Sequence, residues 1–448
     1  MSFNSDFLWG VATSAAQIEG GATVDGRSPS IWDVFAKRSG KVASSRLFPT
    51  ACNSYNLFDR DLENLKGLGV NSYRMSISWS RVLPQGTGML NPQGVDYYKR
   101  VFEKLNEAGI KPNVTLYHWD LPQILEEKGG WANRDCIGWF AEYAEKMFAT
   151  FSDVVPMWTT VNEPIATYIG YAKGQFAPGH KDEKLGNQAR HNLLVAHGQG
   201  VKAFRAVADK SAQIGIVIDI WKRYPHTPTQ ANLDAVRDED ERNWKFYTDA
   251  VLGSGYSDYI LSTLEKEGTL MDIGQNDYEI MQTPIDFFGL NIYGRVIVSK
   301  DKTPAKKIIQ GGNIQEVKGK KDPQVVYQVV KMLREMYDLK IPIYITENGT
   351  PTYVCELKSF NGRINDNKRI EYMKGYLQWI EKAIEDGLDI RGYYAWSLMD
   401  NIEWCAGPFM KYGLIHTNLR NFKTTWKKSA YFYRDFIKAH SKIDKEHM

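Results

Sequence analysis

The sequence contains few cysteines and no long apolar run. Its 448 residues include four cysteines, which lie far apart and form no C-x-x-C pair of the kind found in zinc or redox sites. No stretch of about 18 consecutive apolar residues is present, so we expect no transmembrane helix. The opening residues, MSFNSDFLWGVATS, lack the basic region and the apolar stretch of a secretory signal peptide. These absences predict a cytoplasmic protein with reduced thiols and no contact with a membrane.

An excess of charge of one sign is also missing. Lys and Arg number 56 against 53 Asp and Glu, and the net charge of +3 is too close to balance to indicate binding of nucleic acid. No Gly/Ser-rich linker or low-complexity tract divides the chain. We therefore predict one large domain, residues 1–448, although the length alone would allow about three domains of roughly 150 residues each.

Aromatic residues, in contrast, are abundant. The chain holds 13 Trp, 25 Tyr and 19 Phe, which together make 13% of its residues. Rings in this number indicate either a large core or platforms on which the flat apolar faces of sugars stack. Composition alone does not choose between these two uses.

Short β-rich apolar runs alternate along the chain with longer stretches of helical periodicity. The predicted strands are 8–13, 72–78, 112–118, 157–163, 212–219, 287–293, 342–347 and 392–398. The predicted helices include 58–68, 95–108, 137–151, 193–208, 324–337 and 370–385. Eight strand–helix repeats predict an α/β fold, a closed (β/α)8 TIM barrel, in preference to an open doubly wound sheet. The remaining length is expected in loops 14–56, 164–190 and the Lys-rich 294–323.

Polar side chains stand at the C-terminal ends of several predicted strands. In barrel enzymes this end carries the active site, because side chains from different strands converge there. The residues found at these ends are Arg74, Ser76, His118, Asn162, Glu163, Asp219, Asn291, Tyr293, Glu347 and Trp396. Ordinary strand ends would instead be dominated by Gly, Pro and Ser. The pattern therefore suggests a polar site at the mouth of the barrel.

Two glutamates at these strand ends suit a specific reaction. Glu163 ends the fourth predicted strand in TVNEP, and Glu347 ends the seventh in ITENG. A single glutamate at a strand end is more often a solvated or salt-bridged residue. Two opposed carboxyl groups fit the cleavage of a glycosidic bond, in which one protonates the leaving oxygen and the other attacks or guides water.

With these motifs the sequence resembles glycoside hydrolase family 1, the β-glucosidase family. The resemblance covers essentially the whole chain and includes FLWGVATSAAQIEG (7–20), YRMSISWSRVLP (73–84), YHWDLP (117–122), GGWANRD (129–135), TVNEP (160–164), DFFGLNIY (286–293), ITENG (345–349) and WSLMDNIEW (396–404). It implies a retaining enzyme that hydrolyses β-glucosides, with β-galactosides and β-fucosides as further candidates. Its partner would be a small-molecule β-glycoside or oligosaccharide. Water is the usual acceptor, so no metal or cofactor is expected.

The resemblance also implies a role for each matching residue. Glu163 matches the acid/base, Glu347 the nucleophile, and Arg74 and Tyr293 the groups that orient and tune the nucleophile. Trp396 matches the ring on which the sugar stacks, and Trp131 lies in a motif whose ring lines the pocket. The residues that match substrate-binding positions are Gln17, His118, Trp131, Asn162, Asn291, Tyr293, Trp396, Glu403 and Trp404.

The chemistry of retention sets physical requirements on the two glutamates. Glu163 must be protonated near neutral pH, so its pKa has to be raised by burial or by the charge on Glu347. Glu347 must be ionised, which the cation of Arg74 and the hydroxyl of Tyr293 would favour. The two carboxyl groups are expected to lie ~5–5.5 Å apart, as in retaining enzymes.

Structural interpretations of the same residues remain open. His118 could be a hydrogen-bonded core histidine, and Trp396 and Trp404 could be core rings, which is the commoner use of tryptophan. Arg74 could simply neutralise a buried carboxylate. His191 and His197 are six residues apart, a spacing that suits neither a metal pair nor the strand-end pattern, so both are expected in a helix without a catalytic role.

The chain departs from the usual family pattern in its outer region. Asn53-Ser54 stands where Asp-His is common, KGKKDP (318–323) where GWEVYP is frequent, and Cys405-Ala406 follows the Glu403-Trp404 pair. Asp219 takes the place of an Asn. We expect these changes to affect the aglycone preference, with Asp219 disfavouring anionic aglycones or pairing with a lysine of the segment 300–321.

Three other functions compete with hydrolysis of β-glucosides. A phospho-β-glycosidase would need a cationic phosphate site, whereas Glu403 would repel phosphate, and Trp404 is present where that subgroup usually replaces it. A non-catalytic sugar-binding relative should have lost a catalytic glutamate, and both are retained. A transglycosylase would use the same residues and differs only in its acceptor. The preferred sugar and the oligomeric state are not encoded in any pattern of the sequence.

Overall fold

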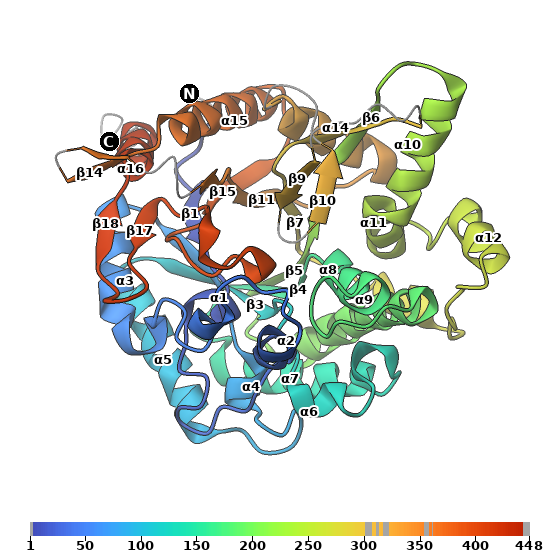
Figure 1. Cartoon of the computed structure of the whole chain (residues 1–448), viewed down its shortest axis with the longest axis horizontal. Coiled ribbons are helices and arrows are strands. Elements are labelled where there is room, and N and C mark those ends of the chain that lie inside the picture. The colour runs from blue at the N-terminus through green and yellow to red at the C-terminus, as the bar shows by residue number, and fades with distance from the viewer. Residues whose placement is uncertain are drawn as a thin grey trace.

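Eight parallel strands close into a barrel, as the sequence predicted. The computed structural model describes residues 3–300, 307–310, 313–316, 322–353, 358–360 and 362–441. The barrel strands are β1 (Leu8–Ala12), β2 (Ser72–Ser76), β3 (Lys111–Tyr117), β4 (Met157–Asn162), β5 (Gln213–Asp219), β7 (Phe287–Asn291), β11 (Ile343–Asn348) and β15 (Ile390–Trp396). Their spatial order is β1-β15-β11-β7-β5-β4-β3-β2, so β1 pairs with both β15 and β2 and the ring closes. Helices surround the ring on its outside (Figure 1).

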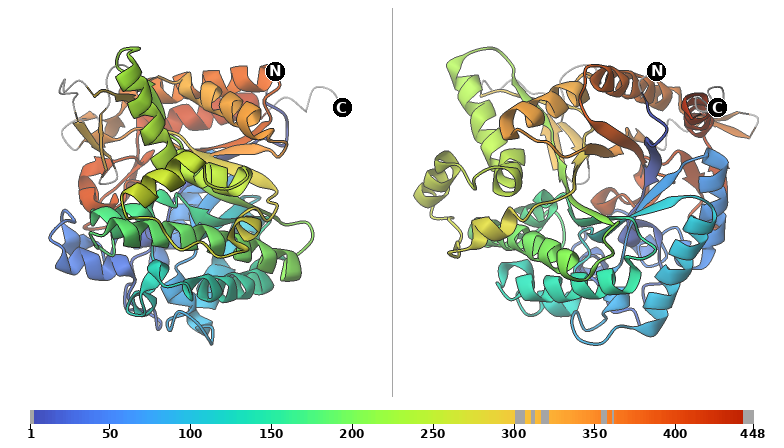
Figure 2. Two further views of the ribbon diagram at one scale, coloured as in Figure 1. Left: turned by 90° about the vertical axis from the view of Figure 1, so that its right-hand side faces the viewer. Right: turned by 180° about the vertical axis from the view of Figure 1, so that it is seen from behind.

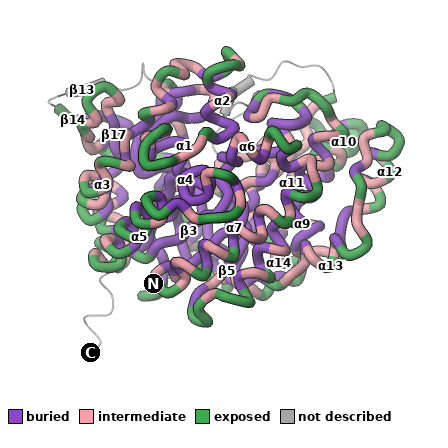
Figure 3. Tube along the Cα trace, turned by 90° about the horizontal axis from the view of Figure 1, so that it is seen from below, coloured by how far each residue is buried: buried purple, intermediate pink, exposed green. Residues whose placement is uncertain are grey.

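The strands are buried along almost their whole length (Figure 3). This is the expected result for a parallel barrel, whose outer face is covered by helices and whose inner face is filled by side chains. Leu8, Met157, Phe287 and Tyr344 stand at or near the N-terminal ends of their strands and pack together as an inner cluster. They close that end of the barrel, so a site can form only at the other end.

The helices that follow the strands form the outer ring. They include α3 (Ser54–Leu68), α5 (Pro92–Glu107), α7 (Cys136–Phe151), α9 (Glu183–Val207), α14 (Val325–Tyr337), α15 (Asn367–Glu385) and α16 (Lys428–His440). The hydroxyl of Tyr433 in α16 donates to the carbonyl of Gly10 in β1 at 2.8 Å. Helix α16, the last described helix, thus contacts the first strand of the barrel (Figure 2).

Local signals explain where these helices begin and end. In α5, Tyr98, Val101, Phe102 and Leu105 are fully or almost fully buried at helical spacing. Gly109 follows shortly after the end of the helix with φ +69°, a left-handed conformation that a glycine adopts at low cost.

The three predicted loops contain short elements of their own. Segment 14–56 includes α1 (Ala15–Ile18), α2 (Ile31–Arg38) and the 3-10 turn η1 (Ser45–Leu47), and segment 164–190 includes α8 (Ile165–Tyr168), the π-helical turn η3 (Ile169–Lys173) and the first turns of α9. Segment 294–323 includes β8 (Arg295–Val298), β9 (Lys307–Gln310) and β10 (Asn313–Glu316). Most of its lysines, Lys302, Lys306, Lys318, Lys320 and Lys321, lie outside the described residues. None of the helices in the described ranges has the length and apolar character needed to cross a bilayer.

Candidate active site

A cavity opens at the C-terminal end of the barrel, where the sequence placed the site. Its lining combines four carboxyl groups with aromatic rings. The lining residues are His118, Trp119, Glu163, Ile165, Ala166, Ile169, Phe176, Asp219, Trp221, Tyr293, Glu347, Trp396, Glu403, Trp404 and Tyr412. They come from at least six barrel strands or the segments that follow them, so the site exists only once the barrel has closed.

Glu347, near the end of β11, is held by one cation and one hydroxyl. Arg74 Nη1 donates to Oε1 at 2.6 Å, and Tyr293 Oη donates to Oε2 at 2.6 Å. Arg74 is completely buried, so its charge acts on Glu347 with little screening by water. Both carboxylate oxygens therefore accept a hydrogen bond, one of them from a buried cation. Arg74 thus neutralises a buried carboxylate, and that carboxylate lines the cavity.

Asn162 connects the two glutamates through side-chain hydrogen bonds. Its Oδ1 accepts from Arg74 Nη2 at 2.6 Å and from Asn291 Nδ2 at 3.1 Å. Its Nδ2 lies 3.2 Å from His118 Nε2. Asn291 Nδ2 also donates to Glu163 Oε1 at 2.7 Å. A continuous chain of polar contacts thus runs from Glu347 through Arg74, Asn162 and Asn291 to Glu163.

Glu163 has a very different environment from Glu347. The neutral amide of Asn291 is its hydrogen-bond donor, and Thr346 Oγ1 donates to Asn291 Oδ1 at 2.8 Å, which fixes that amide with its nitrogen toward Glu163. Burial raises the pKa of Glu163 well above its usual value, and the nearby charges of Asp219 and Glu347 raise it further. The carboxyl group is therefore kept protonated.

The backbone at Glu163 is strained. Its φ is +45°, in the left-handed region that a residue with a side chain seldom adopts, and Trp119 and Trp404 in the cavity lining share this conformation with φ of +76° and +46°. Strain of this kind concentrates at functional sites, where the surrounding structure holds it. At Glu163 the amide donates to the carbonyl of Val217 in β5 at 2.9 Å, which anchors the turn after β4.

The other side of the cavity is formed by Glu403, Trp404 and Trp396. Gln17 Nε2 donates to Glu403 Oε2 at 3.3 Å and to the carbonyl of Ile402 at 3.1 Å. Burial raises the pKa of Glu403 to about 8, and the charge on Glu347 adds to the effect. The rings of Trp396 and Trp404 both lie nearly parallel to the imidazole of His118, with centroids about 6 Å apart.

His118 faces the cavity and is not merely a core histidine. One ring nitrogen, Nε2, contacts Asn162, whereas the buried Nδ1 has no hydrogen-bond partner among the described protein groups. Burial lowers the pKa of His118 well below its usual value, and the charge of Arg74 lowers it further, so the ring is neutral. A neutral imidazole with an open nitrogen suits a hydroxyl-bearing ligand.

One expectation about the cavity is wrong. Trp131, in the short turn η2 (Gly130–Ala132), does not line it and is completely buried beneath the cavity wall. Its ring packs edge-on against Tyr117 at 4.9 Å and Trp79 at 6.3 Å. These ring contacts hold Trp131 in the core, and Trp119 of the 117–122 motif lines the cavity instead.

The two histidines that were expected to have no catalytic role lie in a helix, as predicted. His191 and His197 are both buried in α9. His191 contacts the hydroxyl of Tyr256 at 2.9 Å and the carboxylate of Asp277 at 2.8 Å, and His197 contacts the hydroxyl of Thr160 at 2.6 Å. Neither lines the cavity.

A second, outer cavity of about 530 Å³ continues from the first. Asp219 and Trp221 line both, and Trp221 lies parallel to Tyr293 with ring centroids 5.8 Å apart. Partial burial raises the pKa of Asp219 to about 7, which the charge of Arg223 opposes. The structure thus gives Asp219 an arginine neighbour, while most of the lysines proposed as its partner lie outside the described residues.

Four aromatic residues of the cavity were not found from the sequence: Trp119, Phe176, Trp221 and Tyr412. Trp119 stands beside His118 and Trp221 two residues after Asp219, so their position next to strand ends was an available signal. Phe176 and Tyr412 lie far in the sequence from the end of any barrel strand. Only the closed fold brings them to the cavity.

Comparison with known proteins agrees with this geometry. Residues 1–442 match the model of Glycosyl hydrolase family 1. The chain is 39% identical to β-glucosidase A of Acetivibrio thermocellus over 445 residues, which cover 98% of both chains. It is 38% identical to β-glucosidase A of Thermotoga maritima over 448 residues, or 97% of this chain and 98% of the relative.

Solved structures give the same result. The β-glucosidase from Thermotoga maritima in complex with glucoimidazole has a TM-score of 0.90 and 37% identity, covering 98% of this chain and 99% of the other. The AHE enzyme from Alicyclobacillus herbarius has a TM-score of 0.91 and 35% identity, with coverage of 98% and 99%. Sequence and structure agree along the whole length, and the chain therefore belongs to glycosyl hydrolase family 1.

Proposed function

We propose that this chain is a retaining β-glycosidase that hydrolyses β-glucosides, with Glu347 as nucleophile and Glu163 as general acid/base. The observation that carries the proposal is the contrast between two carboxyl groups of one cavity. Glu347 accepts hydrogen bonds from a guanidinium and a phenol, whereas Glu163 accepts one from an amide and has a raised pKa. One group is thus ready to attack and the other to donate a proton.

In the first step, a carboxylate oxygen of Glu347 attacks the anomeric carbon of the sugar from the face opposite the aglycone. The glycosidic C–O bond breaks as Glu163 transfers its proton to the leaving oxygen, and the aglycone departs as a neutral alcohol. The product is a glycosyl ester of Glu347. Glu163 is now a carboxylate.

In the second step, Glu163 accepts a proton from water as the water oxygen attacks the anomeric carbon. The bond to Glu347 breaks, the sugar leaves with its original anomeric configuration, and both glutamates return to their starting states. The two inversions account for retention. Neither step requires a metal or an organic cofactor.

Arg74 and Tyr293 would tune the nucleophile. When Glu347 forms an ester, its carboxylate loses its charge. Arg74 and Tyr293 must therefore give up their interaction with that charge while they stay in place. Burial and the charge on Glu347 raise the pKa of Tyr293 well above its usual value, which keeps this hydroxyl protonated and able to donate throughout the cycle. The amide of Asn162 links Arg74 to the side of the cavity that holds Glu163.

The sugar is proposed to bind between Trp396 and the polar groups of Gln17, His118, Asn162, Asn291 and Glu403. The open Nδ1 of His118 and the carboxyl group of Glu403 supply hydrogen-bonding atoms for sugar hydroxyls, and the indole of Trp396 supplies an apolar face. Solved relatives from Thermotoga maritima are in complex with glucoimidazole and deoxynojirimycin. Both compounds are therefore suitable probes of this chain. β-Galactosides and β-fucosides are further candidate substrates.

The experiment that tests the mechanism is hydrolysis of p-nitrophenyl β-glucoside by the wild type, Glu347→Gly and Glu163→Ala. We expect Glu347→Gly to lose activity by several orders of magnitude and azide to restore turnover with α-glucosyl azide as the product. For Glu163→Ala the azide product should be the β-glucosyl azide, because the nucleophile is still present. Inactivity of the wild type on the glucoside, galactoside and fucoside would overturn the proposal in favour of a sugar-binding protein.

We further propose that residues 1–448 act as one domain in the cytoplasm. The pairing of β1 with both β2 and β15 supports a single unit, because the two ends of the chain meet in one barrel. The thiols of Cys52, Cys136 and Cys405 are free, which fits a reducing compartment. Limited proteolysis tests the first part, and fractionation of the source cells tests the second.

A further inference from the structure

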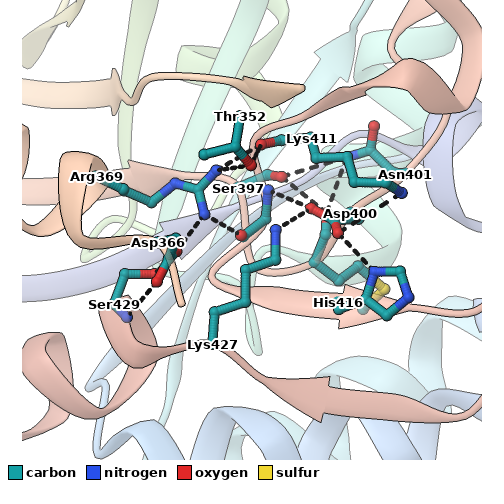
Figure 4. A network of polar contacts seen from close by, with 12 residues as sticks. Thr352, Asp366, Arg369, Ser397, Asp400, Asn401, Lys411, His416, Lys427 and Ser429 are labelled. Atoms are coloured by element: carbon teal, nitrogen blue, oxygen red, sulfur yellow. Dashed lines mark hydrogen bonds and ion pairs between the residues drawn. The ribbon is translucent and has the colours of Figure 1, made fainter. Parts of the chain in front are cut away.

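A network of buried charges surrounds Asp400 (Figure 4), in the same stretch of chain as Glu403. Its centre is Asp400, in the segment 397–404 that joins β15 to the 3-10 turn η5 (Trp404–Phe409). The side chain of Asp400 is 2% exposed. Asp400 does not line the cavity, and neither step of the proposed mechanism uses it.

The Asp400 carboxylate is surrounded by donors. Its Oδ1 accepts from Lys427 Nζ at 2.5 Å and from the amide of Gly413 at 3.0 Å. Its Oδ2 lies 3.0 Å from His416 Nδ1 and 3.8 Å from Lys411 Nζ. Burial alone would raise the pKa of Asp400, but Lys427, His416 and Lys411 outweigh it and bring the pKa well below its usual value. The carboxylate is therefore ionised, and it binds Lys427, His416 and Lys411, three residues from separate positions of the chain.

These contacts fix the segment 397–404 against the segment 411–415. The amide of Asp400 donates to the carbonyl of Ile415 at 2.8 Å, and that of Leu414 donates to the carbonyl of Ser397 at 2.9 Å. The two backbones approach so closely at Gly413 that an added Cβ would lie 2.0 Å from the amide nitrogen of Asp400. Tyr412, between Lys411 and Gly413, lines the cavity.

On the inner side of the segment 397–404, hydrogen bonds connect Asn401, the residue next to Asp400, to Glu403. Asn401 Nδ2 donates to Ser397 Oγ at 3.3 Å, and Asn401 Oδ1 accepts from Gln17 Nε2 at 3.3 Å. The same nitrogen of Gln17 lies 3.3 Å from Glu403 Oε2. A displacement of Asp400 would therefore move Asn401, Gln17 and Glu403 together, and Tyr412 with them.

We propose that Asp400 is a positioning residue for sugar binding. Its buried carboxylate holds the segments 397–404 and 411–415 together, so that Glu403, Trp404 and Tyr412 meet the sugar in a fixed arrangement. This role rests on the proposed function, because the sugar is the ligand that the arrangement serves. Asp400 acts through these neighbours and touches neither the sugar nor the reacting atoms.

Two variants test the role. Asp400→Asn keeps the shape of the side chain and an acceptor for the Gly413 amide, but it removes the charge. Because Lys427 would then be buried without its counter-ion, Asp400→Asn is expected to be less stable than the wild type. The double variant Asp400→Asn/Lys427→Met also removes the fully buried cation, so that only the more distant Lys411 and the partly exposed His416 lose their carboxylate, which keeps the test possible if the single variant folds poorly.

The matched control is Asp277→Asn. Asp277 is also buried, with its side chain 1% exposed, and it pairs with Arg134 at 2.5 Å and His191 at 2.8 Å. Its pKa is likewise lowered well below its usual value, because the hydrogen bonds and charges of His191 and Arg134 outweigh burial. It lies in α13 (Asp277–Met281), which contributes nothing to either cavity. Asp277→Asn thus removes a comparable ion pair without disturbing the sugar site.

Each protein is measured for its melting temperature, for kcat and KM with p-nitrophenyl β-glucoside, and for the Kd of deoxynojirimycin by calorimetry. We expect both Asp400 variants to raise KM and Kd by about tenfold, the effect of misplacing one strong hydrogen-bonding group, while kcat changes by less than about threefold. Asp277→Asn should lower the melting temperature but leave KM and Kd within about twofold of the wild type.

Two results would overturn the positioning role. One is a folded Asp400 variant, single or double, with KM and Kd equal to those of the wild type. The other is an equal rise of KM and Kd in Asp277→Asn, which would reduce the effect to general destabilisation. Failure of the proposed function is distinguishable from both, because the wild type itself would then neither cleave the glucoside nor bind deoxynojirimycin.

Discussion

At the scale of single residues, the site shows how one amino-acid type takes two roles. Glu163 and Glu347 have the same side chain and line the same cavity. Their neighbours separate them, because Glu347 has a buried arginine at 2.6 Å, whereas Glu163 has the uncharged Asn291 at 2.7 Å and two nearby acidic groups. The environment, and not the residue type, decides which carboxyl group holds the proton.

Removing the hydroxyl of Tyr293 tests the tuning of the nucleophile. Tyr293→Phe deletes the 2.6 Å hydrogen bond to Glu347 Oε2 and keeps the ring that stacks near Trp221. We expect kcat/KM for p-nitrophenyl β-glucoside to fall by about 10- to 100-fold, since a hydrogen bond to a charged group contributes about 1.5–3 kcal/mol. Tyr433→Phe, in α16, loses a buried hydrogen bond to the carbonyl of Gly10 in β1; it is the control and should change kcat/KM by less than about twofold. Equal losses in the two variants would contradict a specific role of Tyr293.

Asp219 gives a prediction about the pH dependence of activity. Its charge raises the pKa of Glu163, and on the proposed mechanism activity is lost at high pH when Glu163 ionises. Asp219→Asn removes that charge, so the alkaline limb of the kcat/KM profile should move to lower pH, while the rate at about pH 5.5 changes by less than about threefold. The profile is measured with a neutral and an anionic aryl glucoside.

The same experiment examines the aglycone preference. If Asp219 repels anionic aglycones, Asp219→Asn should raise kcat/KM for the anionic substrate relative to kcat/KM for the neutral one. Asp6→Asn, at an exposed position remote from the site, serves as the control and should leave the profile unchanged. An alkaline limb that stays in place in Asp219→Asn would show that Asp219 does not act on Glu163.

The sequence predicted residues of this site where a motif placed them at a strand end, and it failed where packing decides. Glu163, Asn162, Asn291 and Glu347 lie at strand ends, and the barrel alone brings them together. Trp131 has no such signal, because it lies in a short turn and not at a barrel-strand end, and packing against Tyr117 and Trp79 decides where its ring lies. Pairs such as Gln17 and Glu403, 386 residues apart, follow no local pattern.

At the scale of elements, the periodic parts of the chain were predictable and their ends were not. The predicted strands differ from the observed ones by one or two residues, because a run of buried residues has a clear length. Helix α9 begins ten residues before the predicted start, at Glu183 instead of 193. Asp182 caps it, with its carboxylate accepting from the amide of Leu185 at 3.0 Å, and such a cap extends a helix through residues that lack an apolar stripe.

Replacing either of two glycines by alanine should change the free energy of unfolding, with opposite signs at the two positions. Gly138 lies in α7 at an exposed position with open space around its Cβ, so Gly138→Ala should raise the free energy of unfolding by about 0.4–1 kcal/mol. At Gly413 an added Cβ would meet backbone atoms of the segment 397–404, at 2.0 Å from Asp400 and 2.2 Å from Met399, so Gly413→Ala should lower the free energy by about 1–3 kcal/mol. Denaturant unfolding of both variants and the wild type provides the measurement. A Gly413→Ala protein as stable as the wild type would contradict the close approach of these two segments.

At the scale of the whole molecule, closing the barrel buries ionisable groups that an open chain would leave in water. Burial raises the pKa of Glu403 to about 8 and that of Asp120, whose two carboxyl oxygens have no partner among the described protein groups, to about 7. Nothing in the sequence marks these groups as buried, because their neighbours, such as Gln17 for Glu403 and Arg27 for Asp120, are distant in the sequence. The site therefore costs stability at any pH at which its acids would ionise in water.

The burial of these acids predicts how the free energy of unfolding changes with pH. The pKa of Glu403 is about 8 in the folded chain against 4.5 for an exposed glutamate. Between these values the folded protein retains a proton that the unfolded chain has lost, so the contribution of Glu403 to stability is fully present below about pH 4.5 and disappears as the pH rises toward 8. The buried His118 and His197 act in the opposite sense, but only below 6.5, the ordinary pKa of histidine. The effect of Glu403 is thus separable by comparison with a variant that cannot ionise.

Glu403→Gln is that variant, and its free energy of unfolding is compared with that of the wild type at about pH 5 and pH 8.5. Because Gln stays neutral at every pH, we expect the free energy of unfolding of the variant to increase relative to that of the wild type as the pH rises, by an amount on the order of a few kcal/mol. Asp6→Asn, which changes an exposed carboxylate, should follow the wild type at both pH values. A difference between Glu403→Gln and the wild type that is the same at both pH values would mean that Glu403 is ionised in the folded protein. The sugar site would then hold its charge at neutral pH through hydrogen bonds to Gln17, and the destabilisation attributed to burial would have to come from another group.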